Sequence, residues 1–209
     1  MKPTSNNTIH PILIGITGGI GSGKSYICHQ LEQTGHHVFY CDDVAKQIIR
    51  TQADVKRELT ALVGPDVYDA AGQLVKSVLA AYLCRGTDYS HRIDQIVHPR
   101  VAAAFKQQAA LLRPSTPTTL ECDEKVISLQ QLQQLPPDSV LFMECALLFE
   151  SGFDQLVDKS VVVHVSQETQ LKRLMERDHI SREKALRWIS LQLAEDVKVG
   201  RADYVINNE

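Results

Sequence analysis

Long hydrophobic runs are missing from this 209-residue sequence. No apolar stretch approaches the roughly 20 residues that a membrane-spanning helix needs, so the sequence predicts no membrane segment. The N-terminal stretch Met1–Pro11 is polar and lacks the basic start and apolar core of a secretory signal peptide. We therefore expect a chain that neither spans a membrane nor carries an export signal.

Paired cysteines and helical zinc motifs are missing as well. The adjacent His36 and His37 do not have the spacing of two ligands on one helix face, and no H-E-x-x-H occurs, so we interpret them as loop histidines. An odd set of cysteines without a C-x-x-C pair is typical of reduced thiols and predicts a cytoplasmic location. The five cysteines are Cys28, Cys41, Cys84, Cys122 and Cys145.

The sequence also has no excess of basic residues over acidic ones. The sequence has 22 Lys and Arg against 25 Asp and Glu, which gives a formal net charge of −3. A general nucleic-acid-binding protein needs a broad basic surface, so we expect no nucleic-acid partner. The apolar content of 44% and the charged content of 22% are those of an ordinary globular domain, and the length allows one sizeable core.

The most informative stretch is Ile12–Ser25, which reads I-L-I-G-I-T-G-G-I-G-S-G-K-S. An apolar strand runs into glycines, and Gly18, Gly23, Lys24 and Ser25 match the phosphate-binding loop G-x-x-x-x-G-K-[ST]. Glycines let backbone amides converge on phosphate oxygens, and the following helix adds its unpaired donors. A flexible glycine-rich turn is the alternative. The predicted nucleotide-binding residues are Gly19, Ile20, Gly21, Ser22, Gly23, Lys24, Ser25 and Tyr26.

Lys24 and Ser25 have separate predicted roles in this loop. The Lys24 ammonium would reach the β- and γ-phosphates of ATP, and the Ser25 hydroxyl would bind Mg²⁺. A nucleotide switch of the GTPase kind would also need a guanine-reading N-K-x-D, which the sequence does not contain. The loop therefore favours an ATP-dependent enzyme.

A second short strand, Val38–Cys41, is followed by Asp42 and Asp43. Asp42 has two interpretations. It caps the N-terminus of the next helix, or it is a functional carboxylate at the edge where parallel sheets place their ligands. One residue can do both.

Helical spacing dominates from Val44 to Leu112. We expect Pro99 to end or kink a helix at His98, with helical spacing resuming at Val101. This stretch is too long for a simple crossover between two strands. It therefore predicts an inserted helical lobe.

The segment Pro114–Ser139 differs in composition, because it is rich in Pro, Thr and Gln. Leu129, Leu132 and Leu135 recur at every third position, which is compatible with a short helix. We interpret the segment as a surface excursion, with a partner-binding element as the alternative.

The strand Val140–Cys145 is apolar enough to be central in a parallel sheet, and it carries Glu144 near its end. An acidic residue at the tip of a buried strand can bind Mg²⁺ directly or through water. The alternative is a carboxylate paired with a lysine or a backbone donor.

The last part of the chain predicts two more strands, Ser160–Val165 and Tyr204–Ile206, with helices between them. The complete pattern predicts a three-layer α/β fold with five parallel strands. Between these strands lie four basic residues, which are either a solvated helix face or a mobile lid that closes over transferring phosphate. They are Lys172, Arg173, Arg177 and Arg182.

Six segments in the right order resemble the dephospho-coenzyme A kinase family, relatives of the nucleoside monophosphate kinases. The resemblance covers nearly the whole chain, from Ile12 to Asn207. It is carried by T-G-G-I-G-S-G-K-S (Thr17–Ser25), G-H-H-V-F-Y-C-D-D-V-A-K (Gly35–Lys46), His98-Pro99, L-L-F-E-S-G-F (Leu147–Phe153) and Q-x-x-R-x-x-x-R-D (Gln170–Asp178). The sixth segment, Ala202-Asp203 with Val205, Ile206 and Asn207, resembles the family's closing A-D-x-V-I-x-N.

Several positions depart from the family pattern. Tyr40 replaces an earlier aspartate, Tyr26 a small residue and Ala146 a proline, while Val75-Lys76 stands where an Asp-Arg pair is usual. Lys46 replaces an arginine and can meet a phosphate only as a point charge. The connection over 114–139 is longer than usual, and the family's last helix would follow Asn207.

The resemblance implies a P-loop kinase fold in one domain over residues 1–209. The core would cover about 10–42 and 139–209, a helical substrate lobe about 43–138, and a lid about 168–195. The implied reaction transfers the γ-phosphoryl group of ATP to the 3′-hydroxyl of dephospho-coenzyme A, the last step of coenzyme A synthesis.

The resemblance also implies the residue roles. Asp42, Lys24, Arg173 and Arg177 would be catalytic, with Asp42 accepting the hydroxyl proton. Asp42, Lys46 and His98 would bind the acceptor, and Ser25 and Glu144 would bind Mg²⁺. A kinase for another small acceptor, such as a nucleoside monophosphate, and an inactive nucleotide-binding relative remain as alternatives. Nothing in the sequence bears on oligomeric state.

Overall fold

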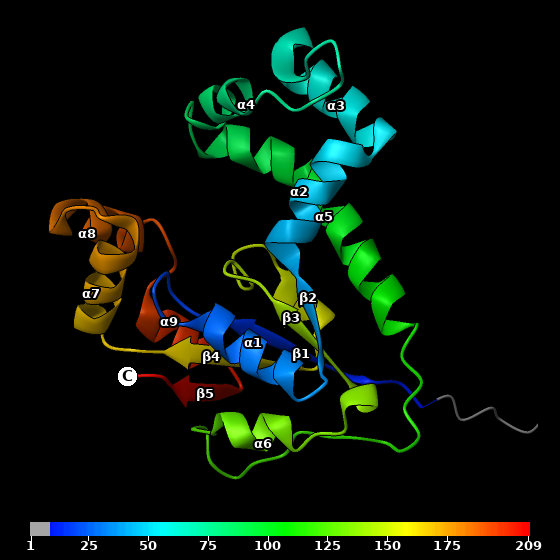
Figure 1. The fold of residues 1–209 in the computed structure, drawn as a ribbon, viewed down its shortest axis with the longest axis vertical. Coiled ribbons are helices and arrows are strands. Elements are labelled where there is room, and N and C mark those ends of the chain that lie inside the picture. Colours follow the sequence, from blue (N-terminus) through cyan, green and yellow to red (C-terminus); the bar gives the residue numbers. More distant parts are fainter. Residues whose placement is uncertain (1–8) are drawn as a thin grey trace, which may run out of the picture. The chain divides into compact units, whose positions relative to one another are not determined.

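The computed structural model describes residues 9–209, and Figure 1 shows the chain as a ribbon. The first eight residues, part of the stretch where no signal peptide is expected, lie outside the described residues. Contacts divide the chain into two compact units, residues 1–39 with 108–209 and residues 40–107.

The first unit is built on the predicted five-stranded parallel sheet, whose strands have the order β2-β3-β1-β4-β5. The strands are β1 (Ile12–Thr17), β2 (His37–Tyr40), β3 (Val140–Glu144), β4 (Lys159–His164) and β5 (Tyr204–Asn207). The register pairs Ile16 of β1 with Glu144 of β3. The central strands consist of apolar side chains because helices cover both of their faces.

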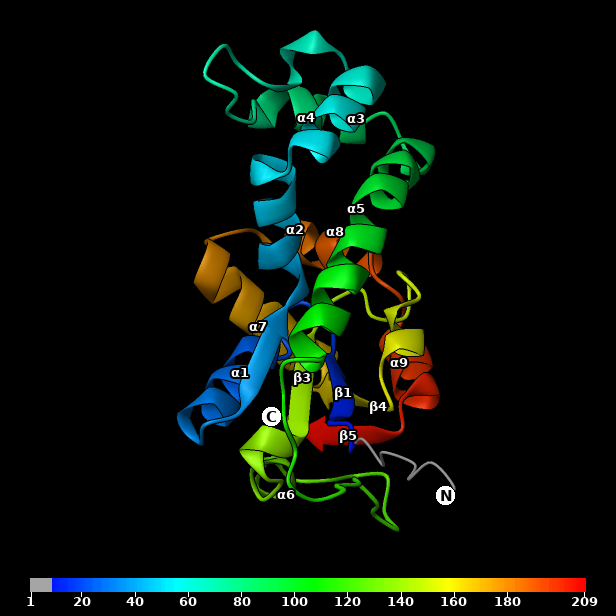
Figure 2. The same ribbon diagram turned by 90° about the vertical axis from the view of Figure 1, so that its right-hand side faces the viewer.

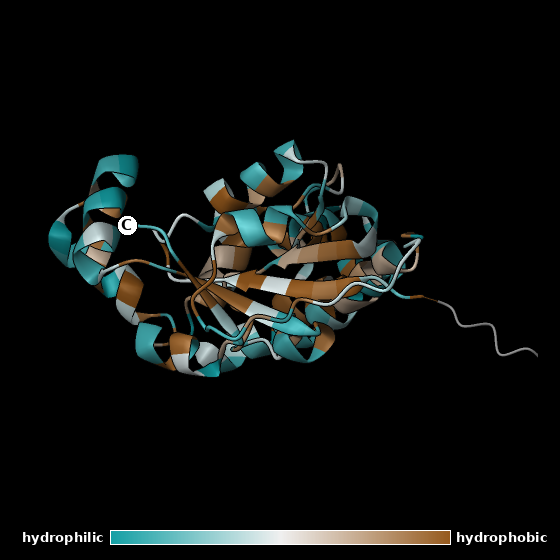
Figure 3. Cartoon of the chain, turned by 90° about the horizontal axis from the view of Figure 1, so that it is seen from below, coloured by the Kyte–Doolittle hydropathy of each residue, from teal (hydrophilic) through white to brown (hydrophobic). Residues whose placement is uncertain are grey.

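Helices α1 (Lys24–Gln33) and α9 (Glu195–Arg201) lie on opposite faces of this sheet (Figure 2). Ile14, Phe142 and Val162 are fully buried between the helical layers. The strands are therefore the most apolar part of the chain, and the helices turn their polar sides outward (Figure 3). This arrangement confirms the predicted three-layer fold.

The second unit is helical, as the spacing predicts. It contains α2 (Cys41–Thr51), α3 (Ala53–Val63), the 3₁₀ turn η1 (Pro65–Val67), α4 (Lys76–Leu83) and most of α5 (Thr87–Ala109). Arg100 of α5 donates hydrogen bonds to Asp54 at 2.9 Å and to Glu58 at 2.5 Å, both on α3. The predicted substrate lobe spans 43–138, whereas this compact unit ends at residue 107.

Of the two effects predicted for Pro99, an end of the helix at His98 is wrong, because α5 contains Pro99 and runs on to Ala109. The predicted kink stays a prediction. Pro99 cannot donate a backbone hydrogen bond. The Arg100 guanidinium donates to the Ile96 carbonyl at 2.6 Å. Arg100 thus connects the turn that contains Pro99 with α3 through its ion pairs to Asp54 and Glu58.

The connection after α5 groups with the sheet unit. The backbone of Val205 in β5 accepts from the Ile127 amide at 2.9 Å and donates to the Lys125 carbonyl at 2.8 Å. A short helix, α6 (Leu129–Gln133), follows a capping box formed by Ser128 and Gln131. The 3₁₀ turn η2 (Pro137–Ser139) then leads into β3. The backbone of residues 125–127 thus pairs with the edge strand β5.

The remaining elements of the first unit follow β3 in the sequence. The 3₁₀ turn η3 (Phe153–Leu156) precedes β4, and the helices α7 (Gln167–Asp178) and α8 (Arg182–Ser190) follow it. Among the described residues, no helix combines the length and the apolar character that crossing a bilayer requires.

Tyr204 provides a test of how the connection is held. Its buried hydroxyl donates to the Leu120 carbonyl at 3.0 Å and accepts from the Cys122 amide at 3.3 Å. Tyr204→Phe leaves both backbone groups without this partner, so we expect the free energy of unfolding to fall by about 1–3 kcal/mol. Urea unfolding measures this change. The control Tyr26→Phe removes an exposed hydroxyl and should stay within about 0.5 kcal/mol of the parent. Equal effects of both substitutions would contradict the proposed anchoring.

Candidate active site

The loop between β1 and α1 has the backbone that phosphate binding requires. Gly23 precedes the helix with φ 91° and ψ 21°, and no side chain caps the first turn of α1. The first amides of a helix are unpaired, and they carry the positive end of its dipole. Together they form an anion-binding turn.

Close neighbours hold this turn in place. A Cβ atom on Gly23 would collide with the Asn208 side-chain amide, and one on Gly21 would approach the Gln170 carbonyl to 3.0 Å. The Asn208 amide also donates to the Ser22 carbonyl at 2.8 Å. Side chains larger than hydrogen are therefore excluded at Gly23 for steric as well as conformational reasons.

Lys24 lies within the loop rather than in solvent. Its side chain is 8% exposed, and its ammonium donates to the carbonyls of Gly18 at 2.9 Å and Gly19 at 3.4 Å. Burial raises the pKa of the nearby Cys28 thiol far above its usual value. The charge of Glu144 acts on that thiol pKa in the same direction, and the charge of Lys24 opposes it. Glu144 and Lys24 are thus both close to the same buried point behind the loop.

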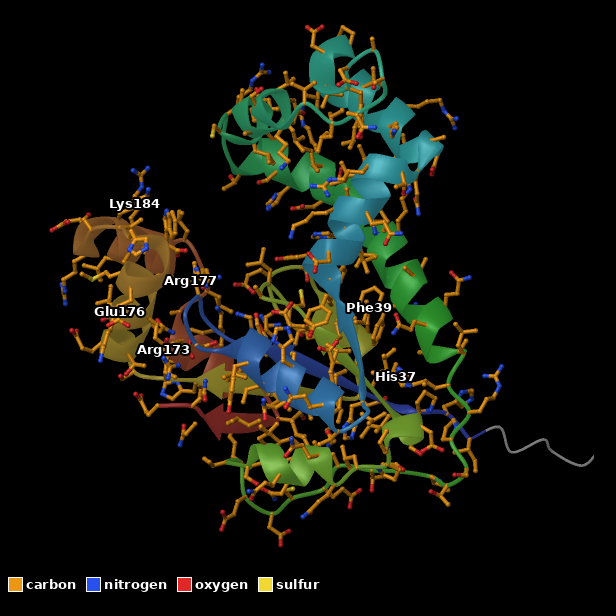
Figure 4. The ribbon with its side chains drawn as sticks, in the orientation of Figure 1. His37, Phe39, Arg173, Glu176, Arg177 and Lys184 are labelled. Carbon is orange, nitrogen blue, oxygen red and sulfur yellow. The ribbon has the colours of Figure 1, made fainter. Side chains whose placement is uncertain are left out.

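A pocket of about 530 Å³ opens beside the loop. Its walls combine the predicted loop residues with side chains from α7, which Figure 4 labels. They are Ile20, Gly21, Gly23, Lys24, Ser25, Arg173, Glu176 and Arg177. The fold therefore brings Lys24 and Ser25 together with the two arginines that the sequence places about 150 residues away.

The two arginines differ in how they are held. Arg173 donates to the Asn208 carbonyl at 2.8 Å and to the Ser22 carbonyl at 3.4 Å, which fixes it against the loop. Arg177 forms an ion pair of 2.7 Å with Asp178 and is more exposed. This hydrogen bond raises the pKa of Arg177 and lowers the pKa of Asp178, so both are charged at neutral pH. Arg177 can turn toward a ligand without breaking a buried contact.

Helices α7 and α8 form the hairpin predicted as a lid, and its small core includes part of the loop. Leu171, Leu174 and Ala185 are buried between the two helices, and Ile20 of the loop packs against them. The amide of Ile20 also donates to the Gln192 side chain at 2.8 Å. The loop and the hairpin are therefore in direct contact.

Sequence reasoning missed Gln192, and it missed the contact of Asn208 with the loop. Gln192 follows α8 in an irregular segment, and no local pattern indicates that its amide reaches Ile20. Asn208 directly follows Asn207, the last residue of β5 and of the closing family segment, so the end of this strand was the signal that could have pointed to it. Its importance depends on β5 ending beside the loop, which only the sheet order establishes.

Tyr26 lies apart from the other predicted nucleotide-binding residues. It follows Ser25 directly, but it does not line the pocket beside Lys24, and its side chain is 57% exposed. Successive residues of a helix point about 100° apart, so neighbours in sequence face different surfaces. Tyr26 instead lines a second pocket, together with residues of β5 and of the connection.

The predicted acceptor-binding residues all belong to the helical unit. Asp42 is exposed in the first turn of α2. The residue at the cap position is Tyr40, without a side-chain cap, so the interpretation of Asp42 as the N-cap is wrong. The helix begins at Cys41, earlier than the strand pattern suggests. Asp42 still lies where a carboxylate complements the helix dipole.

The other two predicted residues of this unit have ionic partners. Lys46 pairs with Asp43 at 2.9 Å, and this hydrogen bond raises the pKa of Lys46. His98 lies 3.4 Å from Asp94, one turn earlier in α5. Lys46 is therefore a firmly charged, exposed cation that is available to an anionic ligand.

Within the described residues, no group of three or more His, Cys, Asp or Glu side chains is arranged to hold a metal. Ser25 lines the loop pocket, and Glu144 ends the strand beside β1. Two oxygen donors fit Mg²⁺, which usually keeps waters and substrate phosphates among its ligands. The donor set thus suits magnesium that arrives with a nucleotide rather than a dedicated metal cage.

The loop geometry leads to a matched pair of glycine tests. Gly23 and Gly152 both have left-handed backbone, with φ of 91° and 74°, but no atom lies within 4 Å of a Cβ on Gly152. Both Ala substitutions carry a conformational cost of about 1–2 kcal/mol. Only Gly23→Ala must also displace Asn208, so we expect it to be the more destabilising and to weaken ATP binding. Thermal unfolding and ATP titration measure the two effects. Equal unfolding free energies and equal ATP affinity would show that Asn208 does not confine the loop.

Comparisons with known proteins agree with this geometry. The dephospho-CoA kinase family model matches residues 12–122 and 125–209. A dephospho-CoA kinase from Bacteroides fragilis is 35% identical over 198 residues, which cover 95% of this chain and 85% of the relative. One from Geobacillus kaustophilus is 32% identical over 198 residues, covering 94% and 88%.

Solved structures share the fold. A crystal structure from Thermus thermophilus has a TM-score of 0.72 at 28% identity and covers 96% of this chain and 90% of its own. The dephospho-CoA kinase from Campylobacter jejuni has a TM-score of 0.53 at 19% identity, covering 94% and 88%, which supports the fold alone. With a family model that matches nearly every described residue, this chain belongs to the dephospho-CoA kinase family.

Proposed function

We propose that this chain transfers the γ-phosphoryl group of ATP to the 3′-hydroxyl of dephospho-coenzyme A. The reaction is the final step of coenzyme A synthesis. The observation that carries the proposal is the pocket in which Lys24 of the loop meets Arg173 and Arg177 of α7, in a chain of this family. A phosphoryl donor needs that combination of converging amides and cations.

The loop binds the phosphates of ATP. The unpaired amides of the first turn of α1 donate to phosphate oxygens, and Lys24 is already buried where a β- or γ-phosphate would lie. Ser25 and Glu144 would hold magnesium. Mg²⁺, when bound, neutralises charge that develops on the phosphate oxygens.

The arginines of α7 stabilise the group that is transferred. Arg173 is fixed against the loop by the carbonyls of Ser22 and Asn208, so its charge is positioned before substrate arrives. Arg177 is itself exposed and pairs with Asp178, its neighbour in the sequence, so it can move onto the γ-phosphate. Positioned cations of this kind supply much of the rate enhancement in phosphoryl transfer.

The helical unit supplies the acceptor side. Asp42, in the first turn of α2, accepts the proton of the attacking hydroxyl. Lys46, one turn later on the same helix, and His98 on α5 contact the acceptor. The exposed Lys46 ammonium suits a phosphate of the acceptor as a point charge.

We also propose a cytoplasmic location. The five cysteines form no disulfide, and Cys84 is exposed. Exposed thiols persist in a reducing compartment such as the cytoplasm.

A direct assay tests the reaction. ATP consumption is measured with dephospho-coenzyme A, with nucleoside monophosphates and with small alcohols, and the product is identified by mass and by the position of the new phosphate. We expect turnover only with dephospho-coenzyme A and a product phosphorylated at the 3′ position. Preferred turnover of another acceptor would replace the proposed substrate. ATP binding without turnover of any acceptor would identify an inactive relative.

Substitutions of Asp42 and Asp43 test whether Asp42 is the general base. Both carboxylates lie in the first turn of α2, so each Asn substitution removes a similar helix-dipole interaction. We expect Asp42→Asn to lower turnover by about 10²-fold, the lower end of the usual range for a general base, because phosphoryl transfer has a loose transition state. Asp43→Asn should keep most of the activity. If steady-state kinetics show equal losses, Asp42 is not the base.

Substitutions of Arg177 and Arg187 test whether the Arg177 guanidinium contributes to phosphoryl transfer. Both are exposed arginines of the helical hairpin, but only Arg177 lines the loop pocket. We expect Arg177→Ala to lower the turnover number by at least about 10²-fold with a small change in ATP affinity, because its charge acts mainly in the transition state. Arg187→Ala should resemble the parent. Unchanged turnover in a folded Arg177→Ala variant would leave this arginine as a surface charge.

A further inference from the structure

We infer that Lys198, a buried residue of α9, positions the phosphate-binding loop through the carboxylate of Glu195. The inference rests on the proposed function only in that the loop must bind the phosphates of ATP. Helix α9 packs against β4, on the sheet face opposite α1 (Figure 2). Lys198 does not line the loop pocket, so its role is to position the loop rather than to contact the ligand.

The Lys198 side chain is fully buried, yet its amine has no hydrogen-bond partner among the described residues. Lysine is rarely buried without a partner, because the loss of hydration of its charge is costly. Burial lowers the pKa of Lys198, and the charges of Glu150 and Glu195 oppose this effect. These two carboxylates are therefore the groups that favour the charged form of the lysine.

The carboxylate of Glu195 lies directly against the loop. Its Oε2 atom is 3.1 Å from the place that a Cβ atom on Gly19 would take. Its Oε1 atom is 3.2 Å from Nδ1 of His164, at the end of β4. The Gln170 amide lies on the same side of Gly19, so this glycine leaves room for two polar side chains.

Gly19 connects this contact with the groups that meet phosphate. Its carbonyl accepts from the Ser22 amide at 3.1 Å and from the Lys24 ammonium at 3.4 Å. A shift of Gly19 would therefore move both the turn that presents the amides and the lysine of the loop. Glu195 thus supports the loop without lining the ligand pocket.

Glu150 supports the same region through the segment between α8 and α9. Its carboxylate accepts from the Leu193 amide at 3.0 Å. The preceding residue, Gln192, is bonded to the loop amide of Ile20. Glu150 and Glu195 have like charges, which repel each other, and the charge of Lys198 faces both and offsets that repulsion. The lysine therefore allows both carboxylates to stay in these positions.

The first test separates positioning from stability. Methionine has about the length of lysine but no charge, and replacing a buried ion by an apolar side chain is often neutral or stabilising. Glu150 is exposed and Glu195 partly so, and both can remain hydrated without the lysine. We therefore expect Lys198→Met to unfold at the temperature of the parent or higher. In calorimetric titration of the full chain it should nevertheless bind MgATP about tenfold more weakly. The control Arg201→Met removes a cation of the same helix, whose partner is Asp154, and should keep the ATP affinity.

A second pair of variants tests the route through Glu195. Glu195 and Asp196 both lie in the first turn of α9, so Glu195→Gln and Asp196→Asn remove a similar interaction with the helix dipole. We expect only Glu195→Gln to weaken ATP binding, by about tenfold. Combining it with Lys198→Met should cause no further loss, because both changes disrupt one contact. Magnesium tripolyphosphate should lose affinity by the same factor as MgATP, since the affected groups bind phosphates.

The outcomes distinguish a positioning role from a structural one. Weaker ATP binding at parental stability, without a further loss in the double variant, supports the inference. Unchanged ATP affinity in Lys198→Met overturns it. An additive loss in the double variant, or an equal fall in stability and affinity, also overturns it and makes Lys198 a structural residue alone. If Lys198→Met does not fold, Glu195→Gln and Asp196→Asn decide, and equal affinities overturn the inference. The titrations contain no acceptor, so they are independent of whether dephospho-coenzyme A is the substrate.

Discussion

The tight turn between β1 and α1 is the constraint on which the rest of the site depends. Its amides can converge on one point only because Gly23 has left-handed backbone and no side chain. That geometry is costly by itself, and neighbours maintain it: Asn208 from the end of β5, Arg173 from α7 and Ile20 within the hairpin core. The strand order, which sets β4 and β5 on one side of β1, brings these supports together. The sheet therefore serves chiefly to position the carboxyl ends of its strands.

Charge is concentrated on one side of this turn. Lys24 is buried between backbone carbonyls, and the arginines converge from α7, so the site holds positive charge before any phosphate arrives. Such preorganisation avoids the cost of reorienting groups during the reaction. On the other side, beyond Tyr26, the surface carries no charge. The charged side chains thus lie on one side of the start of α1, and uncharged side chains line the pocket on the other side.

The sequence predicted those features that local patterns encode. The apolar strands, the glycine loop and the i, i+4 spacing of Arg173 and Arg177 are local, and the structure places these residues as expected. Other features depend on tertiary context. Pro99 does not end α5, and Tyr26 lines a pocket other than the one beside Lys24. The contacts of Gln192 and Asn208 with the loop join distant segments, so no window of sequence contains them. The role of Asp42 remains a prediction.

The position of Ile20 links ligand binding at the loop to the packing of α7 against α8. It belongs to the loop, yet its side chain packs with Leu174 and Ala185, and its amide is bonded to Gln192. A ligand that changes the position of Ile20 must therefore change the packing of α7 on α8. Coupling free energies are reciprocal, so the state of the hairpin alters ATP affinity by the same factor by which ATP alters the hairpin. We therefore expect a substitution at Ile189, which packs in that core, to change nucleotide affinity without touching the ligand.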